Sequence, residues 1–321
     1  MPARVTWMDL YRGFAVVLVA AGHSMVPETN PVISHICIAL SAYRIPALLF
    51  LSGVLLPRSL EKPTSVFLSG KLRRIVWPCV LWTAIMLGIF GIDNALHPRY
   101  WLLAEQPHTW YLDALVMFYL LGLLTRRIPP IVVALALLVV SLPVGMLGSP
   151  DDFPGMVWHR PWYGFFFFLG AALQPHLHRV IRAPWWIALI AAVFSVPWMV
   201  HVARLGGEAN GGLLAALGSG VGLVVVLWAA PRVPRIAPVR ALEWMGRNSI
   251  VIYLVHFPAM FAWHQMGFGA GGVLPYLLMF VLSVGAGVGA VLLRPWSRFL
   301  YEFPGAWRPR AESRTEMQPA R

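Results

Sequence analysis

Long apolar stretches separated by short polar connections run along almost the whole chain. Ten of them have the length and hydropathy of membrane spans, at about 6–26, 33–56, 75–92, 108–125, 130–148, 161–176, 184–203, 211–230, 247–266 and 272–293. We expect each to be an α-helix, because backbone groups in hydrocarbon must be satisfied within their own segment. The pattern predicts an all-α, polytopic integral membrane bundle of about ten transmembrane helices.

The predicted bundle forms one membrane-embedded domain over residues 1–300, followed by a short basic cytoplasmic tail over 301–321 that is partly disordered. Composition agrees with this class: 59% of the residues are hydrophobic and only 12% are charged, which excludes an ordinary soluble domain. The two cysteines, Cys37 and Cys79, both lie in predicted spans. We therefore expect no disulfide framework and no metal site.

The net charge of +12 is distributed unevenly among the connections. Alternate connections and the tail carry most of the basic residues, namely Arg58, Lys62, Lys71, Arg73, Arg74, Arg126, Arg127, Arg179, Arg182, Arg232, Arg235, Arg240, Arg247, Arg294, Arg298, Arg308, Arg310, Arg314 and Arg321. The opposite connections carry the acidic residues Glu28, Asp93, Glu105, Asp151, Asp152 and Glu208. By the positive-inside rule, both termini are cytoplasmic. The basic excess then reflects topology and contact with anionic membrane lipids, and we expect no nucleic-acid partner.

Three ionisable residues share one face of the first predicted span. Arg12 and His23 are eleven residues apart, which on a helix returns them to within roughly 20° of each other at a separation of about 16 Å. Asp9, three residues before Arg12, joins the same stripe. Ionisable side chains are costly in lipid, so their alignment predicts a polar cavity inside the bundle.

Five motifs follow one another along the chain. They are Asp9-x-x-Arg12-Gly-x-Ala with His23, Tyr43-Arg44-Ile-Pro46-Ala-Leu-Leu-Phe50-Leu-Ser52-Gly53, Phe67-Leu-x-x-Lys71-Leu-Arg73-Arg74-Ile-x-x-Pro78, Trp110-Tyr-Leu112-x-Ala-Leu115, and Ser249-Ile-Val-Ile-Tyr253-Leu-Val-His256-x-Pro258. In this order they resemble the signatures of the membrane acyltransferase family known as acyltransferase-3, which includes O-acetyltransferases of bacterial polysaccharides. The family often has Arg-x-x-Arg where this chain has Lys71-Leu-Arg73-Arg74.

The resemblance implies an acyl-CoA co-substrate, expected to be acetyl-CoA, with no bound cofactor. It also implies transfer to a hydroxyl of a glycan, lipid or small-molecule acceptor. Such a reaction requires a base for the attacking oxygen and stabilisation of the oxyanion that develops. His23 suits the first need, because the pKa of histidine is near neutrality, and it acts either as general base or as transient acyl carrier. Arg12 and Asp9 complete the predicted catalytic set, or form a structural ion pair.

Lys71, Arg73 and Arg74 are the predicted donor-binding residues. A coenzyme that carries several phosphates needs cationic partners at the cytoplasmic mouth of the bundle. Lysine offers phosphate a point charge, without the bidentate fork of arginine. The same cluster at an inner membrane boundary is also an ordinary determinant of topology, so both interpretations stay open.

Three further residues are candidates for the cavity or for the acceptor. Arg44, in the second predicted span, either pairs with Asp113 or lines the cavity. Asp113 lies beside Trp110 and Tyr111 and is a candidate acceptor binder, although aromatic residues of this kind also anchor helices at the membrane interface. His256 is either a buried hydrogen-bonding histidine or a cavity residue.

Two other functional classes compete with the acyltransferase hypothesis. In a secondary transporter or flippase of a small polar or glycan-linked substrate, the intramembrane charges form a translocation path. Inverted repeats favour that class, and the two halves of the chain show no convincing internal repeat. A catalytically silent membrane scaffold is the third possibility, which the retention of Arg12 and His23 disfavours.

Overall fold

The computed structural model describes residues 6–26, 29–90, 97–102, 108–147, 159–206, 212–267 and 272–306, and within them the regular structure is helical, with no β-strand. The all-α class is therefore confirmed. Each predicted span coincides with a helix: α1 (Thr6–His23), α2 (Pro31–Val54), α5 (Trp77–Phe90), α7 (Trp110–Leu124), α8 (Pro130–Leu147), α10 (Arg160–Leu173), α12 (Trp185–Arg204), α13 (Gly212–Ala229), α15 (Ser249–Gln265) and α16 (Val273–Leu292).

Several of these helices fit a lipid bilayer by length and hydropathy. Within the described residues five segments are long and apolar enough to cross a membrane, namely Pro31–Val54, Thr64–Ile89, Trp185–Arg204, Gly212–Arg232 and Val273–Leu292. The helix Trp110–Leu124 and the segment Pro130–Pro143 are apolar but shorter. These findings agree with a membrane protein, and the count of ten spans stays a prediction.

The third apolar segment begins earlier than the hydrophobic pattern predicted. Here α4 (Thr64–Lys71) passes through a π-helix, η1 (Leu72–Val76), directly into α5, so helical structure starts at Thr64 rather than near residue 75. The other short helices are α3 (Leu56–Leu60), α6 (Pro98–Leu102), η3 (Gln174–His176), α11 (Leu177–Ile181), η4 (Ala230–Arg232), α14 (Ala237–Arg247), α17 (Arg294–Ser297), η5 (Arg298–Leu300) and η6 (Pro304–Ala306).

Close contact between α2 and α10 forms the centre of the core. A Cβ on Gly53 would lie 1.7 Å from the carbonyl oxygen of Phe167, and one on Gly170 would lie 2.1 Å from that of Phe50. Only glycine fits at such a crossing, because any side chain would force the two backbones apart. The aromatic side chains of α10 from Trp162 to Phe168 are buried in this core.

An amphipathic helix that the apolar pattern did not predict packs against α1. The two backbones meet at a pair of glycines: a Cβ on Gly13 would lie 1.9 Å from the carbonyl oxygen of Leu242, and one on Gly246 would lie 1.7 Å from that of Asp9. The buried carboxylate of Glu243 accepts hydrogen bonds from Arg235 at 2.9 and 3.2 Å, which anchors the start of α14. This packing brings the end of α14 next to the polar face of α1.

The segment after α16 folds back onto the third apolar segment. Trp77 and Trp82 donate their indole hydrogens to the carbonyls of Phe299 and Leu300, at 2.7 and 2.9 Å. Tyr301 is buried against α5. Of the predicted tail, 301–321, only the part up to residue 306 belongs to the described residues, so its cytoplasmic, disordered end remains a prediction.

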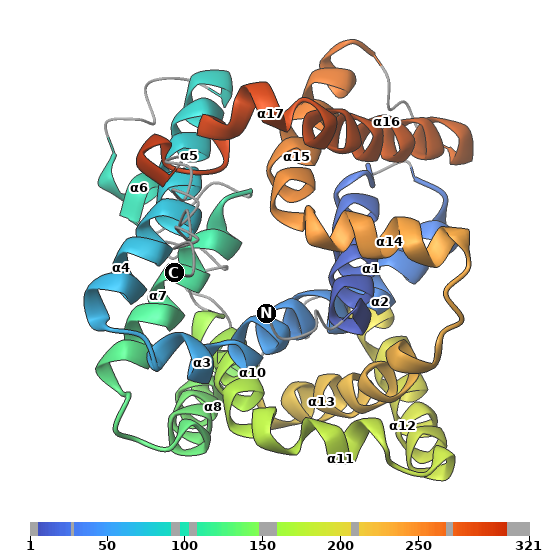
Figure 1. Ribbon diagram of the computed structural model, residues 1–321. Helices are drawn as coiled ribbons and strands as arrows, with labels where there is room; N and C mark the ends of the chain where they lie inside the picture. The colour runs from blue at the N-terminus through green and yellow to red at the C-terminus, as the bar shows by residue number, and fades with distance from the viewer. Residues whose placement is uncertain are drawn as a thin grey trace, which may run out of the picture.

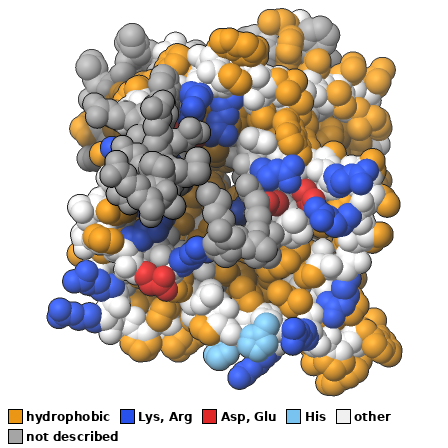
Figure 2. All heavy atoms as spheres, viewed as in Figure 1, with side chains coloured by type: hydrophobic (Ala, Val, Ile, Leu, Met, Phe, Trp, Pro, Cys, Tyr) orange, Lys and Arg blue, Asp and Glu red, His pale blue; other side chains and the backbone are white. Residues whose placement is uncertain are grey.

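The arrangement of helices and surface side chains is consistent with a bilayer environment. In Figure 1, α4, α5 and α7 form one flank, α1, α14, α15 and α16 the opposite flank, and α11, α12 and α13 a third side. Figure 2 shows hydrophobic side chains over much of the surface, with Lys and Arg side chains in the middle of the view and at its lower left edge. Outward-facing residues such as Trp185, Val193 and Leu214 are at least half exposed. Large apolar side chains exposed in this way are typical of proteins embedded in lipid.

Candidate active site

A cavity of about 270 Å³ contains Arg12. Its walls come from α1, α2, α7 and α15, together with the end of α14 and one residue of η1. Arg12 is half-buried in this wall, and Arg247, the last residue of α14, lies exposed at the same cavity. The structure therefore brings two arginines from distant parts of the chain to one cavity.

Hydroxyl groups line the cavity around Ser52. The Ser52 hydroxyl donates to the carbonyl of Leu48 at 2.8 Å and lies 3.4 Å from the hydroxyl of Tyr111. Tyr119 donates its own hydroxyl hydrogen to the Ser52 carbonyl at 3.3 Å. A few fixed polar groups on an otherwise apolar wall are typical of sites that orient a small ligand.

The three basic residues predicted to bind the donor do not share one environment. Lys71, at the end of α4, is half-buried, and its ammonium nitrogen lies 3.2 Å from the ring centroid of Tyr119, a cavity residue. This is a cation–π contact. Arg73 and Arg74 lie on the π-helix and are exposed. Lys71 therefore contacts the cavity wall, whereas Arg73 and Arg74 lie at the surface on a π-helical turn, a structure frequent at functional sites.

A second cluster, of aromatic rings, surrounds His23 at the end of α1. The His23 ring lies 5.4 Å from the ring of His256 and 5.3 Å from that of Phe257, measured between centroids. A third histidine, His108, lies 5.4 Å from His256 and 5.3 Å from Phe257. We call these four rings the histidine cluster. It joins the end of α1, the middle of α15 and the segment just before α7.

Backbone carbonyls of α15 hold two of the three histidines. His108 Nε2 lies 2.8 Å from the carbonyl oxygen of Leu254, and His256 Nδ1 lies 2.6 Å from that of Tyr253. His108 and His256 are 1% and 0% exposed, whereas His23 is half-buried. His23 is thus the member of the cluster with the greatest access to a ligand.

Arg44 approaches His23 from α2. Its guanidinium packs directly over Gly22, where a Cβ would lie 1.9 Å from Nη1, and Nη1 donates to the carbonyl of Leu18 at 3.4 Å. Gly22 precedes His23 in the chain, so the charge of Arg44 lies next to the histidine cluster. Among the described residues Arg44 has no carboxylate partner.

The predicted alternative of an Arg44–Asp113 pair is wrong. Asp113 pairs with Arg160, the first residue of α10, with Nη2 and Oδ2 2.5 Å apart. Arg160 is 4% exposed, so this ion pair is part of the interior of the bundle. The pattern could not predict it, because Arg160 comes from a part of the chain that was assigned to an external connection.

Asp9 and Arg12 occupy one face of α1 but have different surroundings. The side chain of Asp9 is buried, and its backbone carbonyl packs against Gly246. No Asp9–Arg12 ion pair occurs in the part of the chain that the structure describes. The structural ion pair considered for these two residues is therefore not found, and Arg12 is left facing the cavity.

Tyr253 connects the cavity with the histidine cluster. Its ring lines the cavity, and it stacks on the His108 ring with centroids 5.0 Å apart and planes 21° from parallel. Its hydroxyl donates a hydrogen bond to the backbone carbonyl of His108. His108 is not among the site residues predicted from the sequence. Its one signal in the sequence is its position two residues before Trp110 of the Trp110-Tyr111 motif.

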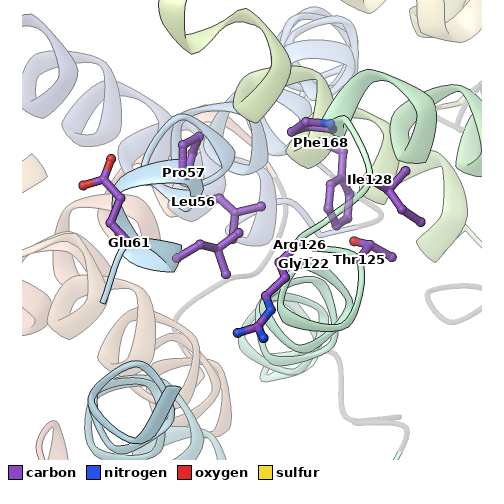
Figure 3. Close-up of a pocket in the computed structure, with 10 residues that line it drawn as sticks. Leu56, Pro57, Glu61, Gly122, Thr125, Arg126, Ile128 and Phe168 are labelled. Carbon is purple, nitrogen blue, oxygen red and sulfur yellow. The ribbon is translucent and has the colours of Figure 1, made fainter. Parts of the chain in front are cut away.

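A second cavity, of about 320 Å³, lies between α3, α7, α8 and α10. Leu56 and Phe168 form its interior, and the charged ends of Glu61 and Arg126 point away from Phe168 (Figure 3). None of the predicted site residues lines it. Its only carboxylate, Glu61, points away from the apolar interior. The Arg12 cavity with the histidine cluster, where predicted site residues gather, is therefore the candidate active site.

Comparison with known proteins identifies the family of the chain. A family model described as an acyltransferase domain matches residues 5–293 of the 321-residue chain. The matched region contains every predicted site residue, from Asp9 to His256. No curated protein and no solved structure matches the chain. Because the model covers almost the whole helical region, the chain belongs to the acyltransferase-3 family.

Proposed function

We propose that this protein is an integral membrane O-acyltransferase that uses acyl-CoA, with acetyl-CoA as the expected donor. The acceptor is a hydroxyl of a glycan, lipid or small molecule. The observation that carries the proposal is the shared residue Tyr253, which joins a cationic cavity to a cluster of histidines. Acyl transfer from a phosphorylated coenzyme needs these two environments next to each other.

The Arg12 cavity is the proposed donor site. Arg12 and Arg247 line it, and Lys71 lies behind its wall residue Tyr119. Guanidinium and ammonium groups bind phosphate through charge-assisted hydrogen bonds. Arg12 and His23 are separated by eleven residues of one helix, or about 16 Å. An extended pantetheine arm has to cover this separation for the thioester to approach His23.

In the proposed reaction His23 acts as general base. It takes the proton from the acceptor hydroxyl while the hydroxyl oxygen attacks the thioester carbonyl and forms a C–O bond. The C–S bond then breaks, and His23 returns the proton to the coenzyme A thiolate. The reaction is balanced without another co-reactant: an alcohol and a thioester give an ester and a thiol. Transient acylation of His23 is the alternative route.

Arg44 is the proposed stabiliser of the oxyanion. Negative charge develops on the carbonyl oxygen of the thioester, close to the base that takes the proton. The guanidinium of Arg44 packs over Gly22, next to His23, and has no carboxylate partner among the described residues. Arg12 is several turns away, so we assign it to the donor; Asp9 is proposed to support it from the preceding turn.

The proposed topology has ten spans with both termini in the cytoplasm. The basic connections then face the cytoplasm, where acyl-CoA is made, and also contact anionic membrane lipids. The acidic residues of the opposite connections, such as Asp151 and Asp152, lie outside the described residues. In this orientation the donor enters from the cytoplasm and the acceptor meets it deeper in the membrane.

Radiolabelled acetyl-CoA added to membranes that contain the protein tests this function. We expect acetyl-CoA-dependent labelling of an acceptor from a panel of glycans, lipids and polyols, and none in membranes without the protein. A secondary transporter or flippase would instead move a labelled substrate across proteoliposomes without forming any ester. Flux without acyl transfer would therefore favour the transporter hypothesis.

A further inference from the structure

Hydrogen bonds and ring stacking fix the position of His108, and one ring atom, Nδ1, takes no part in these contacts. Nε2 faces the carbonyl of Leu254, the ring lies between Tyr253 and Phe257, and its backbone carbonyl accepts a hydrogen bond from Tyr253. Stacking is nearly parallel on the Phe257 side, where the planes differ by 13°. The remaining atom, Nδ1, is buried and has no hydrogen-bond partner among the described residues.

The hydrogen bonds determine which ring nitrogens carry hydrogen. A carbonyl oxygen only accepts, so His108 Nε2 must be the donor to Leu254. In the neutral ring, Nδ1 then carries a lone pair and acts as a hydrogen-bond acceptor. The same reasoning applies to His256: Nδ1 donates to the carbonyl of Tyr253, and Nε2 is a buried acceptor without a partner in the described part of the chain.

Two acceptor nitrogens without partners among the described residues therefore belong to rings whose centroids are 5.4 Å apart. Buried polar atoms without partners are unfavourable, and native structures satisfy nearly all of them. None of the described residues donates a hydrogen bond to either nitrogen, and a bound molecule with an O–H group can do so. A water molecule is the simplest source, and the hydroxyl of a substrate is the other. An ammonium group is disfavoured, because the cationic Arg44 lies beside the same cluster.

We propose that His108 is a specificity-determining residue whose Nδ1 accepts a hydrogen bond from a second hydroxyl of the acceptor. This inference rests on the proposed function, because the first hydroxyl is the one that gives its proton to His23. The acceptor is then a diol, with a second O–H beside the reacting oxygen. His108 decides which of the two hydroxyls reaches His23, and a water molecule fills the position when the site is empty.

Two substitutions separate this role from a purely structural one. The amide of His108→Gln reaches the position of Nε2, so it keeps the hydrogen bond to Leu254 but loses the acceptor at Nδ1. The amide of His108→Asn reaches only the position of Nδ1, so it keeps the acceptor and loses the bond to Leu254. If His108 has only a structural role, His108→Gln should be tolerated and His108→Asn should be harmful. If it has the proposed role, His108→Gln should lose the selection between acceptors and His108→Asn should keep it.

The transfer assay uses ethane-1,2-diol and 1-propanol, which have the same number of heavy atoms, as competing acceptors for radiolabelled acetyl-CoA. We expect the wild type to esterify the diol roughly threefold to tenfold better per hydroxyl, which is the usual effect of one hydrogen bond. The preference should vanish in His108→Gln and persist in His108→Asn. Equal use of both alcohols by the wild type would overturn the proposal, and a bound water would then be the partner of Nδ1. Loss of the preference only in His108→Asn would also overturn it, because the hydrogen bond to Leu254 would then be what matters.

A second measurement needs no turnover, so it separates a failure of this inference from a failure of the proposed function. Nitrogen-15 NMR of protein with labelled histidines, in lipid nanodiscs, reports whether Nδ1 is protonated. The His108 signal is identified by its absence from the spectrum of His108→Asn. We expect an unprotonated Nδ1 whose signal shifts with ethane-1,2-diol and not with 1,2-dimethoxyethane, which has no O–H. A protonated Nδ1, or an Nδ1 signal that does not shift when the diol is added, would contradict the proposal. This result does not depend on whether the protein forms an ester.

Discussion

Tyr253 donates its hydroxyl hydrogen to the backbone carbonyl of His108, and the two rings stack with centroids 5.0 Å apart. The other environment of the Tyr253 ring is the cavity that contains Arg12. One tyrosine is therefore part of the wall of the proposed donor site and of the support of the histidine cluster. A change at this residue should affect both.

Tyr253→Phe is expected to lower acyl transfer severalfold while leaving the fold intact. The variant keeps the stacked ring and loses only the hydrogen bond to His108, at a cost of about 0.5–1.5 kcal/mol in stability. Tyr43→Phe is the matched control, because Tyr43 donates to the carbonyl of Ser195 at 3.0 Å, away from the cluster. Thermal unfolding and transfer rates are measured for both. Equal losses of activity in the two variants would argue against a special role for Tyr253.

The sequence predicted the helices well and their side-to-side contacts poorly. All ten apolar stretches are helical, because hydrocarbon leaves the backbone no other way to satisfy its polar groups. The helix α14 was not predicted, because it is short and amphipathic. Its packing against α1 depends on close glycine contacts that the apolar pattern does not show. The early start of the third segment at Thr64 was missed because basic residues interrupt the apolar pattern there.

In the candidate site, too, features within one helix could be predicted from the sequence and contacts between helices could not. The spacing of Arg12 and His23 on one helix follows from helical periodicity and could be predicted. The pairing of Asp113 with Arg160, and the position of His108, depend on contacts between segments far apart in the chain. Periodicity along one helix carries no information about which neighbour faces it, so these relationships required the structure.

Gly22→Ala should lower the rate of acyl transfer about tenfold or more, because the added Cβ would lie 1.9 Å from Arg44 Nη1 and displace the guanidinium. Gly220→Ala is the matched control: Gly220 is also helical, and a Cβ there meets no atom within 4 Å. The control should be neutral or slightly stabilised, since alanine favours helices. Unchanged kcat in a folded Gly22→Ala protein would remove Arg44 from oxyanion stabilisation.

Lys71→Ala should raise the KM for acyl-CoA about tenfold and change the KM for the acceptor little, because a charge near the donor cavity is lost. Lys62→Ala, which removes an exposed lysine of the same connection, is the control. Arg73→Ala and Arg74→Ala should have smaller effects, since both side chains are exposed. If the KM for acyl-CoA is unchanged in Lys71→Ala, Lys71 does not bind the donor and acts only as a determinant of membrane topology.

Cysteine labelling from outside intact cells tests the proposed orientation. A cysteine introduced at Asp151 should react with a membrane-impermeant reagent, and one introduced at Lys62 should react only after the cells are permeabilised. The native Cys37 and Cys79 provide the background in the unsubstituted protein. The opposite labelling pattern would reverse the orientation, and the donor could then not enter from the cytoplasm at the Arg12 cavity.

In the proposed reaction His23 takes the proton from the acceptor hydroxyl and returns it to the coenzyme A thiolate. The direct test compares transfer of a radiolabelled acetyl group by wild type, His23→Ala and the control His178→Ala, which removes an exposed histidine of α11. At equal expression, we expect His23→Ala to lower kcat by roughly 10²-fold or more with the KM for acetyl-CoA nearly unchanged, and His178→Ala to match wild type. Equal transfer by wild type and His23→Ala would contradict the account.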